Sequence, residues 1–251
     1  MKTLIAIPAM QTVPTKFLRC IENLRRLPDT YTTVSECSLI HDARNEFASI
    51  AIINGFDRVL WIDSDMVFDN DLLLRLSAHL DNGKRMVCGL FFKRVLPTAP
   101  VIYSRQERRT DPVQGEYIKP VIYEDYPTDK PFEVDACGFG AVMTDVALLK
   151  AVWDQYGPPF SHYMNLGEDM SFCYRVRQMG QRIWCDPSVT VGHIGQMVYD
   201  ESVWLTQQAH RCGHDTADTA SDNAIRRGEP DANSTDTAAA DTNHDTTIRR
   251  E

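Results

Sequence analysis

The segment Arg58-Val-Leu-Trp-Ile-Asp-Ser-Asp65 decides how the rest of the chain is interpreted. Residues 58–62 form a short apolar run with β-branched and aromatic side chains, which is typical of a central strand covered on both faces of a sheet. Asp63, Ser64 and Asp65 follow directly, so we expect them at the carboxyl end of that strand. Ligands of open α/β sheets bind at this edge, where two carboxylates can hold a divalent cation or a ligand hydroxyl. An acidic turn leading into a helix is the competing interpretation, because Asp and Ser are common in both roles.

Strands and helices alternate on both sides of this segment. The strands expected in the first half cover residues 3–7, 32–38, 58–62 and 85–90, and the helices cover residues 15–27, 42–54 and 70–80. We expect Asp42 to cap the second of these helices and Gly55 to end it. Repeated β-α-β units predict an α/β protein with a Rossmann-like, mostly parallel central sheet flanked by helices.

After Gly89 the chain has more prolines and shorter strands. The expected strands there cover residues 101–103, 117–123, 132–135, 140–144, 182–185 and 189–193, and the helices cover residues 146–156 and 168–179. This pattern predicts a mixed region that completes the sheet. From residue 214 to 251 the chain contains almost no large apolar side chains, so it cannot offset its ordering entropy and we expect a disordered polar tail.

The overall composition is that of a soluble globular protein, with 43% hydrophobic and 24% charged residues among 251. No stretch approaches the roughly 20 apolar residues of a membrane span, and the apolar run that ends before Pro8 is too short for a signal peptide, so we expect a cytoplasmic protein. The net charge of −9 argues against broad attraction to nucleic acid or anionic membranes. None of the seven cysteines forms a Cys-x-x-Cys pair, which favours reduced, buried thiols.

Three further motifs follow the Asp63-Ser64-Asp65 segment in order: Gly138-Phe139-Gly140, Gly167-Glu168-Asp169 and His193. Each has a simple structural explanation by itself, namely a tight turn, acids favoured at a helix N-terminus and a histidine at a strand end. Taken together and in this order, they resemble the motifs of GT-A fold glycosyltransferases, especially those of the family 2 type. In that family an Asp-x-Asp motif ends the nucleotide-binding half, a glycine loop lines the donor sugar, a Glu-Asp pair opens a helix on the acceptor side, and a late histidine completes the metal site.

The resemblance implies a single GT-A domain over residues 1–213, with a nucleotide-binding half at residues 1–92 and an acceptor and catalytic half at residues 93–213. It implies a metal-dependent enzyme that moves a sugar from a nucleotide-sugar donor, a UDP- or GDP-sugar, to an acceptor hydroxyl. The acceptor is left open among a glycan, a small molecule, a protein and a modified DNA base.

The expected cofactor is Mn²⁺ or Mg²⁺, which stabilises charge on the leaving diphosphate as a Lewis acid. Asp65 is the expected direct ligand of the metal. His193 would join it, because an imidazole ligand favours Mn²⁺ over a site made only of oxygens. Asp63 completes the expected metal set, and the resemblance implies that it contacts the ribose or the water shell of the metal.

Glu168 and Asp169 are the expected catalytic residues. One acid can hydrogen-bond the acceptor while the other takes the proton of its hydroxyl, and the resemblance assigns the base to Asp169. That assignment implies inversion at the anomeric carbon. Retaining enzymes share the scaffold and need no such base.

Donor contacts are expected from the end of the first strand and from the start of the second helix. Arg44 is expected to pair with the diphosphate and Asn45 with the base or ribose, although a solvated helix start is an alternative. The remaining residues expected to bind the donor are Pro8, Ala9, Ser64, Asp135, Gly138 and Gly140.

A basic cluster is formed by Lys93, Arg94, Arg105, Arg108 and Arg109. We expect a mobile, solvated loop. A sharper interpretation is a lid over the diphosphate or a patch facing an anionic acceptor. A hydroxylated base in phage-type DNA would suit such a patch, but it would have to be flipped out of its stack.

Two rival functions remain open at this point. A sugar nucleotidyltransferase also combines a Rossmann-like half with a metal, but the segment from Pro8 to Lys16 lacks the glycine- and lysine-rich signature of that class. A nucleotide-sugar-binding module without catalysis is the other rival. The intact acids and His193 count against it.

Overall fold

The computed structural model describes residues 1–36, 39–113, 115–195 and 198–209. Residues Met1–Gln208 form one compact unit. The tail predicted to be disordered, residues 214–251, lies outside the described residues. Cys37 and Cys212 also lie outside them.

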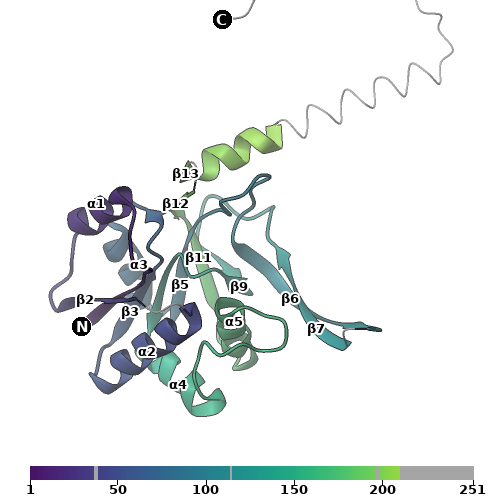
Figure 1. Ribbon diagram of the computed structural model, residues 1–251, viewed down its shortest axis with the longest axis horizontal. Coiled ribbons are helices and arrows are strands. Elements are labelled where there is room, and N and C mark those ends of the chain that lie inside the picture. The colour runs from purple at the N-terminus through teal and green to yellow at the C-terminus, as the bar shows by residue number, and fades with distance from the viewer. Residues whose placement is uncertain (37–38, 114, 196–197, 210–251) are drawn as a thin grey trace, which may run out of the picture. The chain divides into compact units, whose positions relative to one another are not determined.

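A seven-stranded sheet in the order β2-β1-β3-β10-β5-β11-β8 forms the centre of the fold (Figure 1). Strands β10 and β8 run antiparallel to their neighbours, whereas β2, β1 and β3 pair in parallel, as do β5 and β11. The predicted mixed α/β fold with a large, mostly parallel sheet is therefore confirmed. The strands are β1 (Thr3–Pro8), β2 (Thr30–Ser35), β3 (Arg58–Ile62), β5 (Met86–Leu90), β8 (Phe132–Val134), β10 (Ala141–Asp145) and β11 (Ile183–Thr190).

Helices flank the sheet, and the side chains of β3 alternate between two hydrophobic clusters. Val59 and Trp61 enter one cluster, while Leu60 and Ile62 enter the other. All four are at most 1% exposed, so the continuous apolar run reflects a strand that is covered on both faces. The helices are α1 (Thr15–Asn23), α2 (Ile40–Ile53), α3 (Leu72–Asp81), α4 (Val146–Tyr156) and α5 (Glu168–Gln178).

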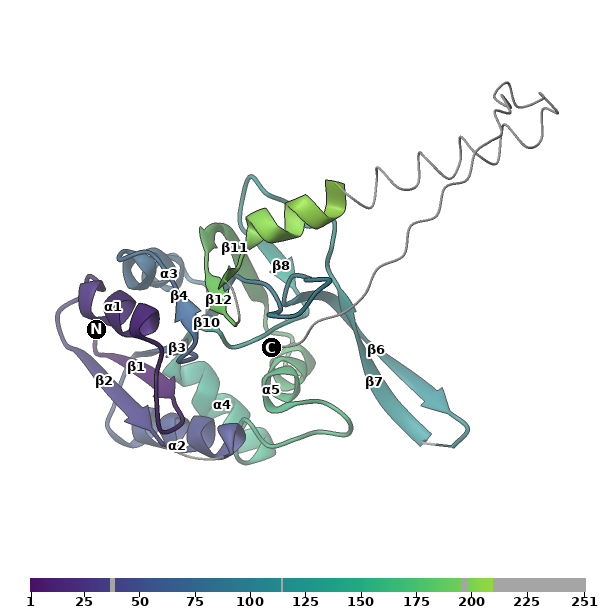
Figure 2. The same cartoon turned by 45° about the horizontal axis from the view of Figure 1, so that its top comes forward.

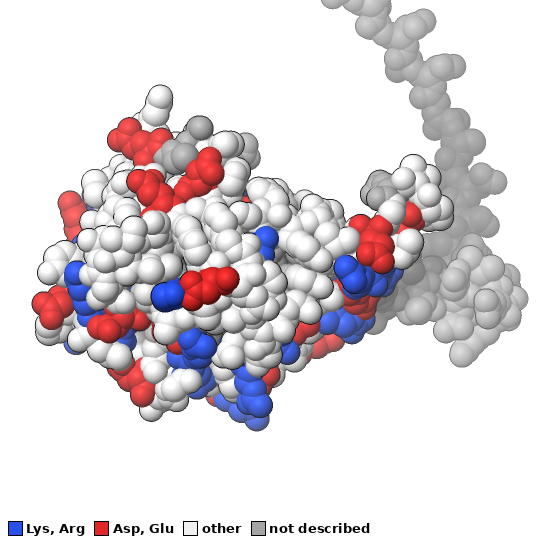
Figure 3. Space-filling model, turned by 90° about the horizontal axis from the view of Figure 1, so that it is seen from below, with Lys and Arg blue, Asp and Glu red and all other residues white. Residues whose placement is uncertain are grey.

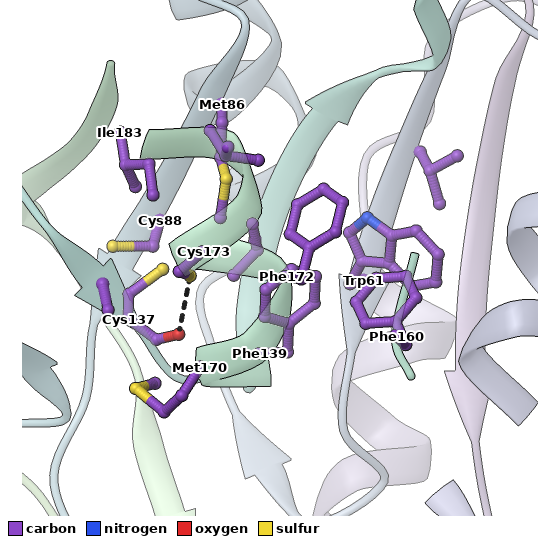
Figure 4. Packing of buried hydrophobic residues seen from close by; sticks show 14 of the residues in the cluster. Trp61, Met86, Cys88, Cys137, Phe139, Phe160, Met170, Phe172, Cys173 and Ile183 are labelled. Carbon is purple, nitrogen blue, oxygen red and sulfur yellow. Dashed lines mark hydrogen bonds between the residues drawn. The ribbon is translucent and has the colours of Figure 1, made fainter. Parts of the chain in front are cut away.

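An aromatic group around Trp61 joins β3 to α5 (Figure 4). The ring of Phe160 lies 5.0 Å from Trp61 and stacks on Phe172 at 4.8 Å between ring centroids. The indole of Trp61 donates a hydrogen bond of 2.9 Å to Thr144 Oγ1 on β10. Beside this group, the thiol of Cys173 donates to the backbone oxygen of Cys137, in agreement with the predicted reduced, buried cysteines.

Two small sheets complete the fold. The first consists of β4 (Met66–Val67), β12 (Gly192–Ile194) and β13 (Val198–Tyr199), and the second of β6 (Ile102–Asp111), β7 (Gly115–Ile122) and β9 (Ala136–Cys137). The β6–β7 hairpin projects from the body of the protein in both ribbon views (Figures 1 and 2). In the first small sheet His193 pairs with Met66, the residue after Asp65. This backbone pairing brings the first and last of the four sequence motifs, Asp63-Ser64-Asp65 and His193, together.

Several predicted boundaries are wrong. Helix α1 ends at Asn23 rather than Leu27, because the chain turns extended at Leu24. Asp42 lies within the first turn of α2 and does not cap it, since the helix already begins at Ile40. The two strands expected at 182–185 and 189–193 are instead one bulged strand, β11, followed by β12.

Gly55 ends α2 as predicted. Its φ of +64° lies in the left-handed region, where a residue without Cβ avoids strain. Phe56 N–H donates to the Ala51 carbonyl and Gly55 N–H to the Ile52 carbonyl, which is the bonding pattern of a Schellman motif.

The basic cluster is not one mobile loop. Arg105, Arg108 and Arg109 lie on strand β6, and each forms an ion pair with Glu107 or Glu116 of the same hairpin. Only Lys93 and Arg94 lie in the connection that follows β5. Within the part of the chain that the structure describes, no helix is long and apolar enough to cross a membrane.

Replacing Phe172 by Ala is expected to lower the free energy of unfolding by about 3–5 kcal/mol, because the cavity between Phe139 and Phe160 cannot close fully. Urea denaturation followed by circular dichroism measures this loss. Ile53→Ala on α2 is the control, since Ile53 is 79% exposed and its removal should change stability by at most about 0.5 kcal/mol. Similar losses in the two variants would contradict the packing described here.

Candidate functional site

Two adjoining hollows lie at the carboxyl ends of β1 and β3. The first has a volume of about 340 Å³ and the second about 350 Å³. They share Asp63, Arg94 and His193 as a common wall. The first hollow is further lined by Pro8, Ala9, Met10, Ile40, Ser64 and Asp65, and the second by Phe91, Lys93, Val95, Val101, Gly138, Phe139 and Asp169.

Asp65 and His193 face each other in the lining of the first hollow, although 128 positions separate them in the sequence. The Nε2 atom of His193 lies 3.3 Å from Asp65 Oδ2. The other ring nitrogen, Nδ1, lies 2.9 Å from the carbonyl oxygen of Phe92, which can only accept, so Nδ1 carries a proton. When Nε2 also carries a proton it donates to the Asp65 carboxylate, and when it does not, its lone pair is free to bind a cation, as in histidines that bind metals.

Arg94 contributes a third group to the same place. Its guanidinium donates to Asp65 Oδ2, the oxygen that His193 faces. Burial opposes ionisation of Asp65, but the hydrogen bond from His193 and the charges of His193 and Arg94 outweigh it and lower the pKa of this carboxyl. Asp65 is therefore poised as an anion that attracts cations.

Asp63 points to a different partner. Arg44 on α2 donates to Asp63 Oδ1 at 2.7 Å through one amino group and to Glu168 Oε1 of α5 through the other. Arg44 is only 2% exposed, and its guanidinium lies 5.1 Å from the ring of Phe139. Burial raises the pKa of Asp63, with Arg44 acting in the opposite direction. Both amino groups of Arg44 are thus occupied by carboxylates, and Arg44 lines neither hollow.

Asp169 is the second residue of helix α5 and lines the second hollow. Its Oδ1 accepts a hydrogen bond of 2.7 Å from its neighbour's backbone N–H, that of Met170. Burial raises the pKa of the Asp169 carboxyl to about 6; Arg44 opposes this shift and Glu168 adds to it. Burial and the nearby charge of Asp169 also raise the pKa of the Tyr103 phenol to about 12. A carboxyl group that titrates near neutral pH is suited to accept and release a proton.

The two glycines of the predicted loop are packed closely against neighbouring side chains, and Gly138 lines the second hollow. A Cβ on Gly138 would lie 2.7 Å from Val101 and 2.8 Å from Phe91. A Cβ on Gly140 would lie 2.5 Å from Met66, and the carbonyl of Gly140 accepts from the backbone N–H of Asp63 at 3.2 Å. Larger residues would displace the side chains of Phe91, Val101 and Met66.

Besides Arg44, two further predicted donor contacts lie apart from the hollows. The side chain of Asn45 accepts from the backbone N–H of Phe160 at 2.9 Å, and Asp135 forms an ion pair of 3.0 Å with Arg177 on α5. Neither lines the hollows. Sequence reasoning did not single out Phe91 and Val101 as lining residues, since nothing distinguishes them from other apolar side chains at strand ends.

A divalent cation fits this site only in part. Over the described residues, no three His, Cys, Asp or Glu side chains come close enough to hold a metal ion. Asp65 and His193 are the two potential ligands that face each other, while Asp63 is bound to Arg44. The site therefore offers two ligands and an open hollow from which a ligand's oxygens and water can supply the others.

No protein-family model and no curated protein matches the chain. Among solved structures, it is similar to A197 from STIV, with a TM-score of 0.56 and 20% identity over 78% of this chain and 86% of that one. It is also similar to GalNAc-T7 with UDP, GalNAc and Mn²⁺, with a TM-score of 0.53 and 13% identity over 78% of this chain. The match spans 44% of the GalNAc-T7 chain, and identities this low show the fold alone. GalNAc-T7 is a GT-A glycosyltransferase, so the predicted GT-A type of fold is confirmed.

The Asp169 carboxyl is expected to titrate near pH 6 in ¹³C NMR spectra of the folded protein, because burial disfavours its charged form. Its folded-state pKa exceeds the unfolded value, so its contribution to stability falls as pH rises from about 4 to above 6. Asp169→Asn removes that loss, and its stability relative to the unmodified protein should be greater at pH 8 than at pH 4. A pH-independent difference in urea denaturation would contradict the raised pKa.

Proposed function

We propose that the protein is a metal-dependent glycosyltransferase that moves a sugar from a UDP- or GDP-sugar to an acceptor hydroxyl. The observation that carries this proposal is the pairing of the Asp65 carboxylate with His193 Nε2 in the wall between two hollows, one of which contains Asp169. The fold shared with a glycosyltransferase solved with UDP and Mn²⁺ supports the same reaction class.

The first hollow would receive the nucleotide. It lies at the carboxyl ends of parallel strands, where α/β sheets bind ligands. Pro8 and Ala9 offer an apolar wall for the base and ribose, and Ser64 offers a hydroxyl. The diphosphate would lie toward Arg94. The long, exposed side chain of Arg94 can turn its guanidinium from Asp65 to the phosphate oxygens.

Mn²⁺ or Mg²⁺ would be held by Asp65 and His193, and when bound it would supply Lewis-acid stabilisation of the charge that develops on the leaving diphosphate. Asp63 would act beside them on the donor, in the orientation fixed by Arg44. Because Arg94 shares Asp65 Oδ2 with His193, it neutralises this carboxylate when no other cation is present.

The second hollow would receive the donor sugar and the acceptor. Asp169 would take the proton of the acceptor hydroxyl as it attacks the anomeric carbon, which predicts inversion. With a pKa of about 6 the carboxyl is mostly ionised at pH 7 and can act as a base there. Glu168, held by Arg44, would orient the acceptor through its second oxygen. Gly138 lines this hollow, and a side chain there would collide with Val101 and Phe91.

Thermal shifts with nucleoside diphosphates test the donor and metal site. UDP or GDP is expected to raise the melting temperature only when Mn²⁺ is present, and Asp65→Asn or His193→Gln should remove this shift. Asp135→Asn is the matched control. It makes the same change from carboxylate to amide, but Asp135 lines neither hollow and pairs with Arg177 instead. Shifts that need no metal and survive Asp65→Asn would refute the proposed site.

Turnover with the same donors separates an enzyme from a binding module. Asp169→Asn should keep the metal-dependent UDP or GDP shift while lowering transfer about 10²- to 10⁴-fold, the usual contribution of a general base. Metal-dependent binding without hydrolysis or transfer from any donor would instead identify a nucleotide-sugar-binding module.

A further inference from the structure

Three arginines are buried in the described part of the chain: Arg44, Arg58 and Arg175. Arg44 pairs with two carboxylates, and Arg58 pairs with Asp81. Arg175, at 7% exposed, forms no ion pair with any described carboxylate, and one of its amino groups donates to the carbonyls of residues 159 and 161. A buried cation without a counter-charge is costly, so a ligand that supplies an anion would be stabilised there.

Arg175 lines a hollow of about 330 Å³ that is separate from the two described above. Three tyrosines contribute to it, and two of them, Tyr163 and Tyr174, stack with their ring centroids 5.1 Å apart. Tyr163 is held in place because its backbone N–H donates to Ser171 Oγ at 2.9 Å. The complete lining is Arg108, Tyr156, Tyr163, Tyr174, Arg175 and Gln178.

The charges around this hollow suit one anionic group rather than a polyanion. Arg105 and Arg109 of the adjacent hairpin are both bound to Glu107. Arg108 has a weaker, exposed contact of 3.5 Å with Glu116 and can turn toward the hollow. On the face shown in Figure 3, acidic and basic side chains are interspersed, with no broad basic patch of the kind that tracks a nucleic-acid backbone.

We propose that this hollow binds the carboxylate or phosphate of an anionic sugar in the acceptor, an inference that rests on the proposed glycosyltransferase function. Arg175 would supply the buried cation and Arg108 a second one. The tyrosine rings would bury the apolar face of a sugar ring, while their hydroxyls and Gln178 bond its hydroxyl groups. Arg175 lies six positions after Asp169 on α5, about 9 Å along the helix axis and about 120° around it, so an acceptor would need more than one sugar unit to span both hollows.

Binding to the full chain is measured by NMR titration without donor or metal. The probes are glucuronate, glucose 6-phosphate, uncharged glucose, inorganic phosphate and a short oligothymidylate. Glucuronate or glucose 6-phosphate is expected to bind at least about tenfold more tightly than glucose, in line with a charged hydrogen bond, and to shift signals of the hollow. Inorganic phosphate should bind more weakly than glucose 6-phosphate, since it lacks the ring.

Arg175→Lys and Arg108→Gln should each weaken binding of the preferred anionic sugar by about tenfold or more. Arg105→Gln is the matched control, because it removes the same charge from the same hairpin outside the hollow, and it should leave affinity unchanged. Arg108 is exposed, so its variant remains informative if Arg175→Lys does not fold.

Equal affinity for glucose and both anionic sugars would overturn the inference. Unchanged affinity for the anionic sugar in Arg108→Gln would also overturn it. A third contrary result would be an oligothymidylate that binds through these residues while the anionic sugars do not. These titrations need neither donor nor metal. Failure of the proposed anion site can therefore be told apart from failure of the proposed glycosyltransferase function. Anion binding without any sugar transfer would refute the proposed function and support the anion site. Sugar transfer without anion binding would support the function and refute the anion site.

Discussion

The site depends on one buried ion group, in which Arg44 joins Asp63 to Glu168. Asp63 follows β3 and Glu168 opens α5, so a single guanidinium connects the strand that carries the acidic motif to the helix that carries Asp169. The buried guanidinium is tolerated because two carboxylates neutralise it and accept from both of its amino groups, and its planar fork fixes their directions. Phe139, below the guanidinium, and the stacked Phe160 and Phe172 leave little room for other arrangements.

This constraint separates the tasks of two acids that are neighbours in the sequence. Asp63 is turned toward Arg44, whereas Asp65 is turned toward His193 and Arg94. The short pairing of β4 with β12 holds the second arrangement, since the backbone N–H of Ile194 donates to the carbonyl of Asp65 at 2.7 Å. The proposed metal ligands are therefore fixed by backbone, while the residues of the ion group are fixed by charge.

Sequence patterns predicted those features of the fold that depend on neighbouring residues in the chain. The apolar run of β3 and the left-handed Gly55 follow from burial and backbone conformation alone, and the fold class follows from alternating strands and helices. The resemblance of four ordered motifs to those of GT-A glycosyltransferases identified Asp65, His193 and Asp169 as candidate site residues. Nothing in the sequence placed Arg44 between two carboxylates or Asp135 on Arg177, because such pairs join segments far apart in the chain. The hairpin arginines were misassigned for a different reason: their partners are close in sequence, but charge patterning alone did not reveal that this segment forms a β-hairpin.

The most direct test of the account is electron–nuclear double resonance of Mn²⁺ bound with UDP or GDP to protein labelled with ¹⁵N-histidine. The account predicts ³¹P coupling from the diphosphate and coupling to one histidine nitrogen, which disappears in His193→Gln while other histidines remain. Coupling to phosphorus without any histidine nitrogen would contradict it, because the metal would then be held without the Asp65 and His193 pair on which the proposed function rests.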